Sequence, residues 1–301
     1  MARALYVINP AGHGGTGLSA WEDFGALWPK PIDPNHVVVT ERRGHARQIA
    51  ASSADYDTIV AVGGDGTANE VLSGILDRPQ PQPRLAIVPA GTGNDIARNV
   101  GVRSIEDAVT VMLDGRDRAY DIIRVDWVID GRPQHGYSFL QGTVGFSAVP
   151  GVRPWMKRLL GPTVAYYLGA ILQMVAYRPP DMTILVDGND HSGRTWMVVV
   201  GNSERTSGDS MCLSPGARLD DGELNVTIIP VGKSKLRMLV RLMPKLASGD
   251  HVKEPHISYQ PARRIEVGSD GPVVMDLDGD VVSTSHATFT VLPRALRIVS
   301  L

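Results

Sequence analysis

The stretch "TIVAVGGDGTANEVLSGIL", residues 58–76, decides the fold of the first half of the chain. Its opening run, residues 58–64, is nearly all apolar, which is typical of a strand buried on both faces of a parallel sheet. A glycine loop follows, built around the single carboxylate of Asp65. Beyond the loop, apolar residues recur at helical spacing: Val71, Leu72, Ile75 and Leu76. A strand, a glycine loop and a helix in this order predict one unit of a parallel α/β sheet.

The same alternation extends to both sides of this unit. Three more apolar runs, at 4–9, 36–40 and 84–90, indicate further buried strands. A helical face ended by Pro29 is predicted from Leu18, Trp21, Gly25 and Trp28. Ser104 with Asp107 resembles a capping box that opens a helix stopping at Gly115. We therefore expect an α/β domain over residues 1–124, with helices on both faces of a parallel sheet.

The pattern changes after about residue 124. Asp-Gly dipeptides, which are strong hairpin signals, separate short strands at 130–131, 187–188, 221–222 and 278–279. Residues 125–301 are accordingly expected to form an all-β domain, an antiparallel sandwich or barrel. Helical insertions are predicted at about 153–177 and near 234–247, the latter interrupted by Pro244. A chain of 301 residues is long enough for two such domains.

The composition excludes several classes of protein. With 30 basic and 32 acidic residues and no basic stripe, the chain does not resemble a nucleic-acid binder. The single cysteine, Cys212, leaves no internal disulfide and fits a reducing cytosol. The N-terminus lacks a signal-peptide pattern, and the longest apolar stretch, 163–177, is shorter than the roughly 20 residues of a bilayer-spanning helix. We expect a soluble, cytoplasmic protein that can contact the inner face of a membrane.

Three glycine loops follow three of the predicted strands, at 9–17, 63–69 and 89–95. Because the carboxyl ends of parallel strands meet at one edge of a sheet, these loops should converge where ligands bind. Freed backbone N–H groups and helix N-termini favour an anion. A carboxylate inside an anion site repels phosphate unless a divalent cation lies between them. Asp65 is therefore expected to face Mg²⁺, directly or through water, and Mg²⁺ to face a triphosphate.

The first loop resembles two other phosphate-binding patterns, and the second loop has a simpler interpretation. Gly12, Gly14 and Gly17 spell the dinucleotide-binding pattern, but Asn9-Pro10 separates them from the strand and the pattern gives the other loops no role. The first loop also lacks the lysine of a P-loop, because Leu18 and Ser19 stand where Lys and Ser/Thr are required. Taken alone, the second loop could be a tight turn whose aspartate caps a helix.

The motifs resemble the diacylglycerol kinase catalytic-domain family, which includes bacterial lipid kinases and sphingosine and ceramide kinases. The resemblance rests first on Asn9-Pro10, "GGDGT" at 63–67 and "PAGTGND" at 89–95. It continues in order through "YDIIRV" at 120–125, "LSPGARLDDGELNV" at 213–226 and "MDLDGD" at 275–280. It implies a nucleotide-binding domain of NAD kinase/phosphofructokinase-like type, a β-rich lipid-substrate domain, and an active site in the cleft between them.

The resemblance also implies roles for individual residues. Nucleotide contacts are expected at Asn9, Pro10, Ala11, Gly12, His13, Thr40, Gly63, Gly64, Asp65, Gly66, Thr67, Ala68, Asn69 and Thr92. A carboxylate network of Asp65, Asp95 and Asp121 is expected to organise the catalytic Mg²⁺. A second, structural metal site would use the Asp221 side chain with the backbone carbonyls of Arg218 and Glu223. Judged from the residues alone, that segment is an ordinary hairpin turn.

The chain departs from the family at the general base. The family has a glutamate at the end of an Asp-Gly-Glu motif, whereas this chain has Asp278-Gly279-Asp280. Aspartate offers the same chemistry with its carboxylate about 1.5 Å further back, and small misplacements can be costly in rate. Asp280 is the expected base, and His286 is the nearest alternative in the sequence.

The implied reaction is transfer of the γ-phosphate of ATP to a lipid hydroxyl, with diacylglycerol as the first choice of acceptor. Within 151–177, the apolar residues Trp155, Met156, Leu159 and Leu160 stand next to Arg153, Lys157 and Arg158, which suits the surface of an anionic bilayer; packing on the sandwich is the alternative. The sequence leaves the oligomeric state open, a homodimer included. Two other functions remain at this point: a NAD kinase-like enzyme with a soluble acceptor, and a non-catalytic nucleotide sensor.

Overall fold

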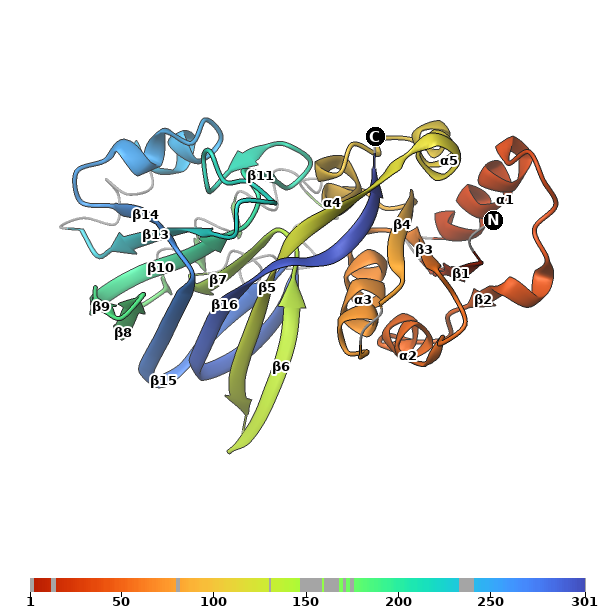
Figure 1. The fold of residues 1–301 in the computed structure, drawn as a ribbon. Coiled ribbons are helices and arrows are strands. Elements are labelled where there is room, and N and C mark those ends of the chain that lie inside the picture. Colours follow the sequence, from red (N-terminus) through yellow and green to blue (C-terminus); the bar gives the residue numbers. More distant parts are fainter. Residues whose placement is uncertain are drawn as a thin grey trace.

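The first half of the chain forms a parallel sheet between helices. The computed structural model describes residues 3–11, 15–79, 82–129, 131–146, 159, 168–169, 172–173, 176–232 and 241–300. Its first elements are β1 (Ala4–Ile8), α1 (Thr16–Leu27), a 3-10 helix (Pro34–His36), β2 (Val37–Val39), α2 (His45–Ser52), β3 (Thr58–Gly63), α3 (Asp65–Leu76), β4 (Arg84–Pro89), α4 (Asp95–Asn99) and α5 (Ile105–Asp114). The strands pair in parallel in the order β4-β3-β1-β2 (Figure 1). The predicted parallel sheet and its strands are confirmed.

The helices follow the predicted patterns with one exception. In α3 the periodic residues Val71, Leu72 and Ile75 are buried, and the predicted capping box of α5 is present. The predicted face of α1 is right only in part: Trp21 and Trp28 pack against the core, where Ala20 and Phe24 are buried, but Gly25 is exposed and Leu18 is 45% exposed. The cause is a contact made by Gly17, the residue before Leu18. A Cβ on Gly17 would lie 1.9 Å from the carbonyl oxygen of Asn9, so the backbone there packs directly on the end of β1.

The second half is antiparallel, as predicted. Its elements are β5 (Arg116–Ile129), β6 (Arg132–Ser138), β7 (Gln141–Gly145), β8 (Asp181–Val186), β9 (Asn189–Asp190), β10 (Gly193–Gly201), β11 (Arg205–Thr206), β12 (Met211–Cys212), β13 (Leu224–Pro230), two 3-10 helices (Met243–Leu246 and Asp250–Lys253), β14 (Ser258–Ala262), β15 (Arg264–Leu277) and β16 (Asp280–Ser300). The main path runs β14-β13-β10-β7-β15-β16, and β8 pairs with both β10 and β15. This pairing curls the sheet around an apolar core of its own.

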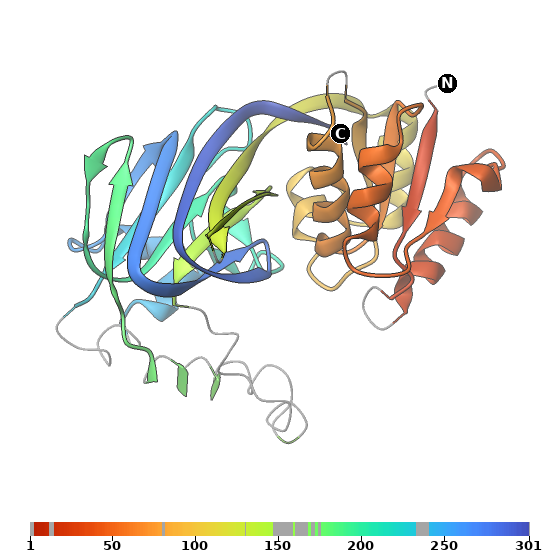
Figure 2. The ribbon, with the colours of Figure 1, turned by 90° about the horizontal axis from the view of Figure 1, so that it is seen from below.

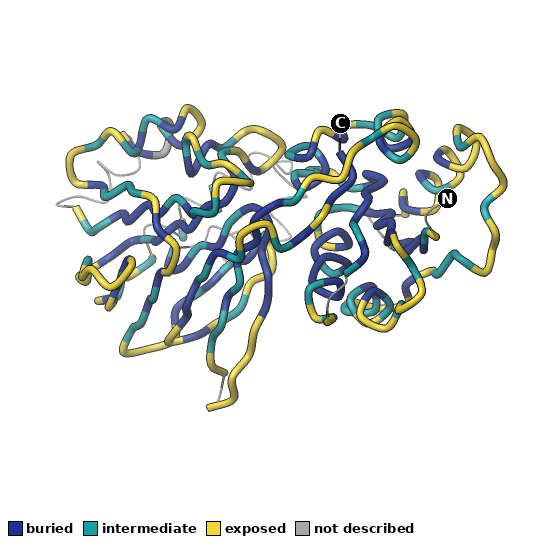
Figure 3. The backbone as a smooth tube through the Cα atoms, viewed as in Figure 1, coloured by how far each residue is buried: buried dark blue, intermediate teal, exposed yellow. Residues whose placement is uncertain are grey.

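Two long strands tie the halves together. β16 pairs with β15 and β5 and, at its end, runs parallel to β4 where Ile298 lies opposite Leu85. Figure 2 shows β5 and β16 passing from the β-rich half to the helical half. Figure 3 shows that both strands have buried stretches separated by or ending in exposed ones. The core of the first half includes Tyr120 and Phe139, so residues beyond the parallel sheet complete it.

Three of the four predicted Asp-Gly turns join paired strands. Asp187-Gly188 joins β8 to β9 and Asp278-Gly279 joins β15 to β16, both with positive φ at each residue. Gly131 lies between β5 and β6. The hairpin predicted at 221–222 is wrong, because that turn leads into β13, whose partners are β10 and β14. Most of the predicted insertions at 153–177 and 234–247 lie outside the described residues. Within the described part, no helix is long and apolar enough to cross a membrane.

Candidate active site

The glycine loops meet at the carboxyl edge of the parallel sheet. Asn9, at the end of β1, donates from Nδ2 to Oγ1 of Thr67 at the start of α3, over 2.9 Å. Thr16 donates its hydroxyl to the carbonyl of Ala90, beyond β4, over 3.1 Å. These two contacts link the first loop to the second and to the third. The expected convergence of the loops is confirmed.

The second and third loops touch through their glycines. A Cβ on Gly91 would lie 2.6 Å from the Cα of Gly64 and 2.8 Å from Oδ1 of Asn94. Gly91 also exchanges two hydrogen bonds with the Asn94 side chain, of 2.8 and 2.9 Å. The two backbones therefore approach more closely than any residue with a Cβ at position 91 would allow.

We expect Gly91→Ala to push these loops apart. Overpacking of this kind costs about 1–3 kcal/mol of stability, and we expect ATP binding to weaken by about tenfold. Gly25→Ala is the matched control, because a Cβ there meets nothing within 4 Å on an exposed part of α1. Thermal unfolding and calorimetric ATP titration of both variants check this. Unchanged ATP affinity in Gly91→Ala would contradict the role given to this contact.

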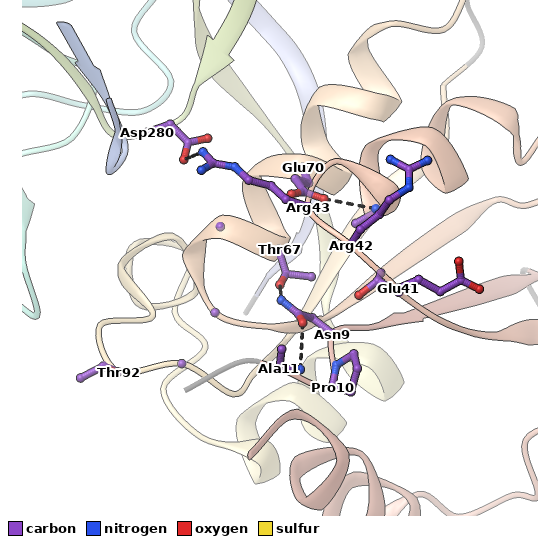
Figure 4. Close-up of a pocket in the computed structure, with 15 residues that line it drawn as sticks. Asn9, Pro10, Ala11, Glu41, Arg42, Arg43, Thr67, Glu70, Thr92 and Asp280 are labelled. Atoms are coloured by element: carbon purple, nitrogen blue, oxygen red, sulfur yellow. Dashed lines mark hydrogen bonds and ion pairs between the residues drawn. The ribbon is translucent and has the colours of Figure 1, made fainter. Parts of the chain in front are cut away.

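The loops enclose a cavity of about 540 Å³ (Figure 4). This is a usual size for a small-molecule site. Of the predicted nucleotide contacts, those that line it are Asn9, Pro10, Ala11, Thr40, Gly64, Gly66, Thr67 and Thr92. Gly63, Asp65, Ala68 and Asn69 are not among its lining residues. Gly12 and His13 lie outside the described residues.

Part of the lining was not predicted. Glu41, Arg42, Arg43 and Ala46 come from the segment that follows β2, Glu70 from α3, and Gly91 from the third loop. Gly44 and Ala46 donate their backbone N–H groups to the Glu70 carboxylate, over 2.7 and 3.2 Å. This pairing anchors the start of α2 against α3. The signal was available in the sequence, since "TERRGHA" at 40–46 also follows a parallel strand at the same edge.

Asp65 directs one carboxylate oxygen toward α4, and the residue is not among those that line the cavity. Its Oδ1 accepts the backbone N–H of Ile96 over 2.9 Å. A Cβ on Gly93 would lie 3.1 Å from Oδ2 of Asp65 and 3.4 Å from Oδ2 of Asp95, so both carboxylates flank Gly93. Burial, assisted by the neighbouring charge of Asp95, raises the pKa of Asp65. Asp95 also accepts the N–H groups of residues 207 and 208.

Asp121 occupies a different position. It is fully buried and accepts the backbone N–H groups of Gly222 and Arg294, over 2.6 and 2.7 Å. Among the described residues no three His, Cys, Asp or Glu side chains form a metal-binding group. Asp65 and Asp95 are thus brought together, whereas Asp121 holds the turn at 219–222 in place. A link between the three aspartates through solvent or metal stays a prediction.

The predicted structural metal site lies in that same turn. Asp221 accepts the backbone N–H of Glu223 over 3.1 Å, and Arg218 pairs with Asp220 over 3.2 Å. Gly222 has a φ of 77°, which gives the chain its tight reversal. The turn is well defined by these contacts alone, and metal binding by Arg218, Asp221 and Glu223 stays a prediction.

Asp280 stands on the opposite wall of the cavity, at the tip of the β15–β16 hairpin. The tip is fixed by Asp278, whose carboxylate accepts the backbone N–H groups of residues 139–141 at distances from 2.6 Å. Burial of that carboxylate raises the pKa of Asp278 to about 6. His286 is six positions further along β16, which corresponds to roughly 20 Å of strand, and does not line the cavity.

The sequence of each half matches a known family model. Residues 3–125 match the diacylglycerol kinase catalytic domain, and residues 143–300 match the YegS C-terminal NAD kinase beta sandwich-like domain. A diacylglycerol kinase of Staphylococcus haemolyticus is 32% identical over 265 residues, which span 86% of this chain and 76% of the relative. The chain belongs to the diacylglycerol kinase family. It is accordingly an ATP-dependent lipid kinase.

A second relative and two solved structures are also similar to this chain. The diacylglycerol kinase of Staphylococcus aureus strain JH9 is 31% identical over 86% of this chain and 80% of its own length. A crystal structure of a diacylglycerol kinase from Bacillus anthracis superposes with a TM-score of 0.71 at 20% identity, covering 100% of this chain and 97% of that one. Yeast NADH kinase in complex with NADH gives a TM-score of 0.56 at 13% identity, over 100% and 84% of the chains. These two structures support the fold: an α/β half followed by a β-sandwich.

A kinase of this family implies a divalent metal ion, and the oxygen donors beside Gly93 fit one. The carboxylates of Asp65 and Asp95 both lie beside Gly93. Without a cation between them, their negative charges repel each other. Mg²⁺ typically binds one or two protein carboxylates, keeps several waters and takes its remaining ligands from substrate phosphates. Two carboxylates next to phosphate-binding loops match that requirement, and a dedicated cage of protein ligands is not needed.

Proposed function

We propose that this protein transfers the γ-phosphate of ATP to the hydroxyl of diacylglycerol, yielding phosphatidic acid. One observation carries the proposal: a single cavity has the glycine loops on one wall and the Asp280 carboxylate on the other. The first wall comes from the α/β half, for which we propose the boundary 1–124, and the second from the β-rich half, 125–301. ATP between the walls directs its terminal phosphate toward Asp280.

Asp280 is the proposed general base. It takes the proton of the lipid hydroxyl while the hydroxyl oxygen forms a bond to the γ-phosphorus. The bond from that phosphorus to the β–γ bridging oxygen breaks, and ADP leaves with the electron pair. The backbone N–H groups around Gly64, Gly66 and Gly91 bind and orient the phosphates, and orientation supplies much of the catalysis in phosphoryl transfer.

Mg²⁺ is the proposed metal, held at Asp65 and Asp95 either directly or through water. When bound, it neutralises the negative charge that builds up on the phosphate oxygens. Asp65 keeps one oxygen on Ile96 and presents the other beside Gly93. The role of these two aspartates is thus to place the ion at the third glycine loop.

Peripheral contact with a membrane is the proposed route to the lipid. Leu159 and Leu172 belong to the segment 151–177, whose composition suits an anionic bilayer surface. Their side chains are 77% and 52% exposed, large values for leucine. Exposed leucines in a segment that also carries cationic residues support docking on an anionic lipid surface.

A lipid panel tests the proposed function. Vesicles with and without an anionic lipid would carry diacylglycerol, a sphingoid base, phosphatidylglycerol or a polyprenol, with γ-labelled ATP and Mg²⁺. We expect labelled phosphatidic acid as the main product, formed faster on anionic vesicles and abolished by chelator. Nucleotide binding with no labelled lipid of any kind would favour a nucleotide sensor, and label on a soluble dinucleotide would favour a NAD kinase-like activity.

A further inference from the structure

Two arginines supply the positive charge of the cavity. Among its described lining residues the only cationic side chains are Arg42 and Arg43, which are neighbours in the segment after β2. The first glycine loop lacks the lysine that a P-loop would place on the terminal phosphates. The γ-phosphate of a bound triphosphate therefore needs a cation from elsewhere on the cavity wall.

The two arginines have different partners. Arg42 donates from Nη2 to the Gln48 side chain over 2.7 Å, and its guanidinium points away from Asp280 in Figure 4. Arg43 reaches across the cavity, and its guanidinium forms an ion pair with the Asp280 carboxylate on the opposite wall. Arg43 is thus the cation that stands where the terminal phosphate and the acceptor hydroxyl must meet.

Hydrogen bonds hold the backbone on both sides of Arg43, whereas the Arg43 side chain extends into solvent. Thr40 donates its N–H to the carbonyl of Ile8 over 2.8 Å, and Gly44 donates its N–H to Glu70 over 2.7 Å. The Arg43 side chain, which lies between these anchors, is 79% exposed. The side chain of its partner Asp280 is 51% exposed. An ion pair so open to water is weak, so a stronger anion can displace Asp280 from Arg43.

A triphosphate is such an anion. A γ-phosphate carries more charge than a carboxylate and offers three oxygens, and the planar guanidinium donates to phosphate in bidentate fashion. While paired with Arg43, one of the two carboxylate oxygens of Asp280, Oδ1, accepts a guanidinium N–H. The same arginine cannot serve both anions fully, so binding of one weakens its hold on the other.

We propose that Arg43 is a further catalytic residue: it binds the γ-phosphate of ATP and, in doing so, releases Asp280 to act as the base. This inference rests on the proposed function, since it assigns Arg43 to the same reaction. In the complex, Asp280 accepts the lipid proton, the lipid oxygen bonds to the γ-phosphorus, and Arg43 stabilises the charge that gathers on the phosphate oxygens before ADP leaves. Binding of a triphosphate thereby frees the second partner of the ion pair, Asp280.

Calorimetric titration with ATP and with ADP, in Mg²⁺ and without lipid, tests the contact. Arg43→Ala is expected to weaken ATP binding by about tenfold or more and to leave ADP binding unchanged, because only ATP has the phosphate that Arg43 holds. Arg43→Lys should recover part of the ATP affinity. Arg264→Ala is the control: Arg264 forms an ion pair with Glu266 at 3.0 Å outside the cavity, and the two side chains are 56% and 34% exposed.

A second comparison tests the exchange of partners. Asp280→Asn should raise ATP affinity by about two- to fivefold, the range that an exposed ion pair is worth, and only when Arg43 is present. In the kinase assay, Arg43→Ala should lower kcat by about 10³, the lower end of the range for an arginine that stabilises a transferring phosphate.

The outcomes separate cleanly. Equal loss of ATP and ADP affinity in Arg43→Ala, or no loss of either, overturns the inference, as does an effect of Asp280→Asn on ATP binding that persists without Arg43. The binding measurements need no lipid. A protein that discriminates ATP from ADP through Arg43 but phosphorylates no lipid would therefore overturn the proposed function and the catalytic role of Arg43, and would leave only its contact with the γ-phosphate standing.

Discussion

Replacing Asp280 with asparagine is expected to lower kcat for lipid phosphorylation by about 10²–10⁴, the usual contribution of a general base. Asparagine has nearly the same shape but cannot take the proton of the lipid hydroxyl. Because Asp278, and not Asp280, binds the backbone of residues 139–141, the hairpin should keep its position and the melting temperature should change little. Steady-state kinetics with diacylglycerol vesicles, together with thermal unfolding, measure both effects.

Asp280→Glu is the informative companion variant. It restores the glutamate that the family motif has at this place and extends the carboxylate by one methylene. We expect it to retain activity within about tenfold of the unmodified protein, since the group keeps its chemistry and stays at the same cavity wall. If Asp280→Asn loses only a few-fold in kcat, the proton goes to another group and the assignment of Asp280 fails.

Replacing Asp65 with asparagine is the second substitution with a large expected effect. The asparagine oxygen can still accept the N–H of Ile96, so the start of α4 should remain in place. Its charge is lost, however, and with it the pairing of two carboxylates beside Gly93. We expect kcat to fall by about 10²–10³, as for removal of a single electrostatic stabiliser, and the Mg²⁺ concentration for half-maximal activity to rise.

A Mg²⁺ titration distinguishes this role from a structural one. If Asp65 served only to cap α4, the asparagine variant would keep its kcat and its Mg²⁺ requirement and would at most unfold at a slightly lower temperature. Gly25→Ala provides the comparison for a substitution on a helix of the same half that has no part in the cavity.

Local pattern was enough to predict the elements that build the site. The apolar run 58–64 and the periodic residues of 71–76 specify β3 and α3 through burial, and parallel order alone brings the glycine loops together. The Asp-Gly signals at 187–188 and 278–279 specify their hairpins because both residues adopt positive φ. Each of these features depends on residues close together in the sequence.

The features that the sequence did not predict depend on contacts that local sequence patterns do not show. The buried face of α1 depends on the contact of Gly17 with the carbonyl of Asn9, and the turn at 221–222 is held by Asp121 from β5. The ion pair of Arg43 with Asp280 joins residues 237 positions apart, across two halves of different architecture. Such contacts follow from packing, and neither periodicity nor turn chemistry indicates them.

The central claim is that the γ-phosphate of ATP lies between the glycine loops and Asp280. A crystal structure with a non-hydrolysable ATP analogue and Mg²⁺ tests it most directly. The account predicts phosphates against Asn9, Gly64, Gly66 and Gly91, a Mg²⁺ ion beside Asp65, and the terminal phosphate on Arg43 within reach of Asp280. An analogue bound outside this cavity, or with its terminal phosphate directed away from Asp280, would contradict it.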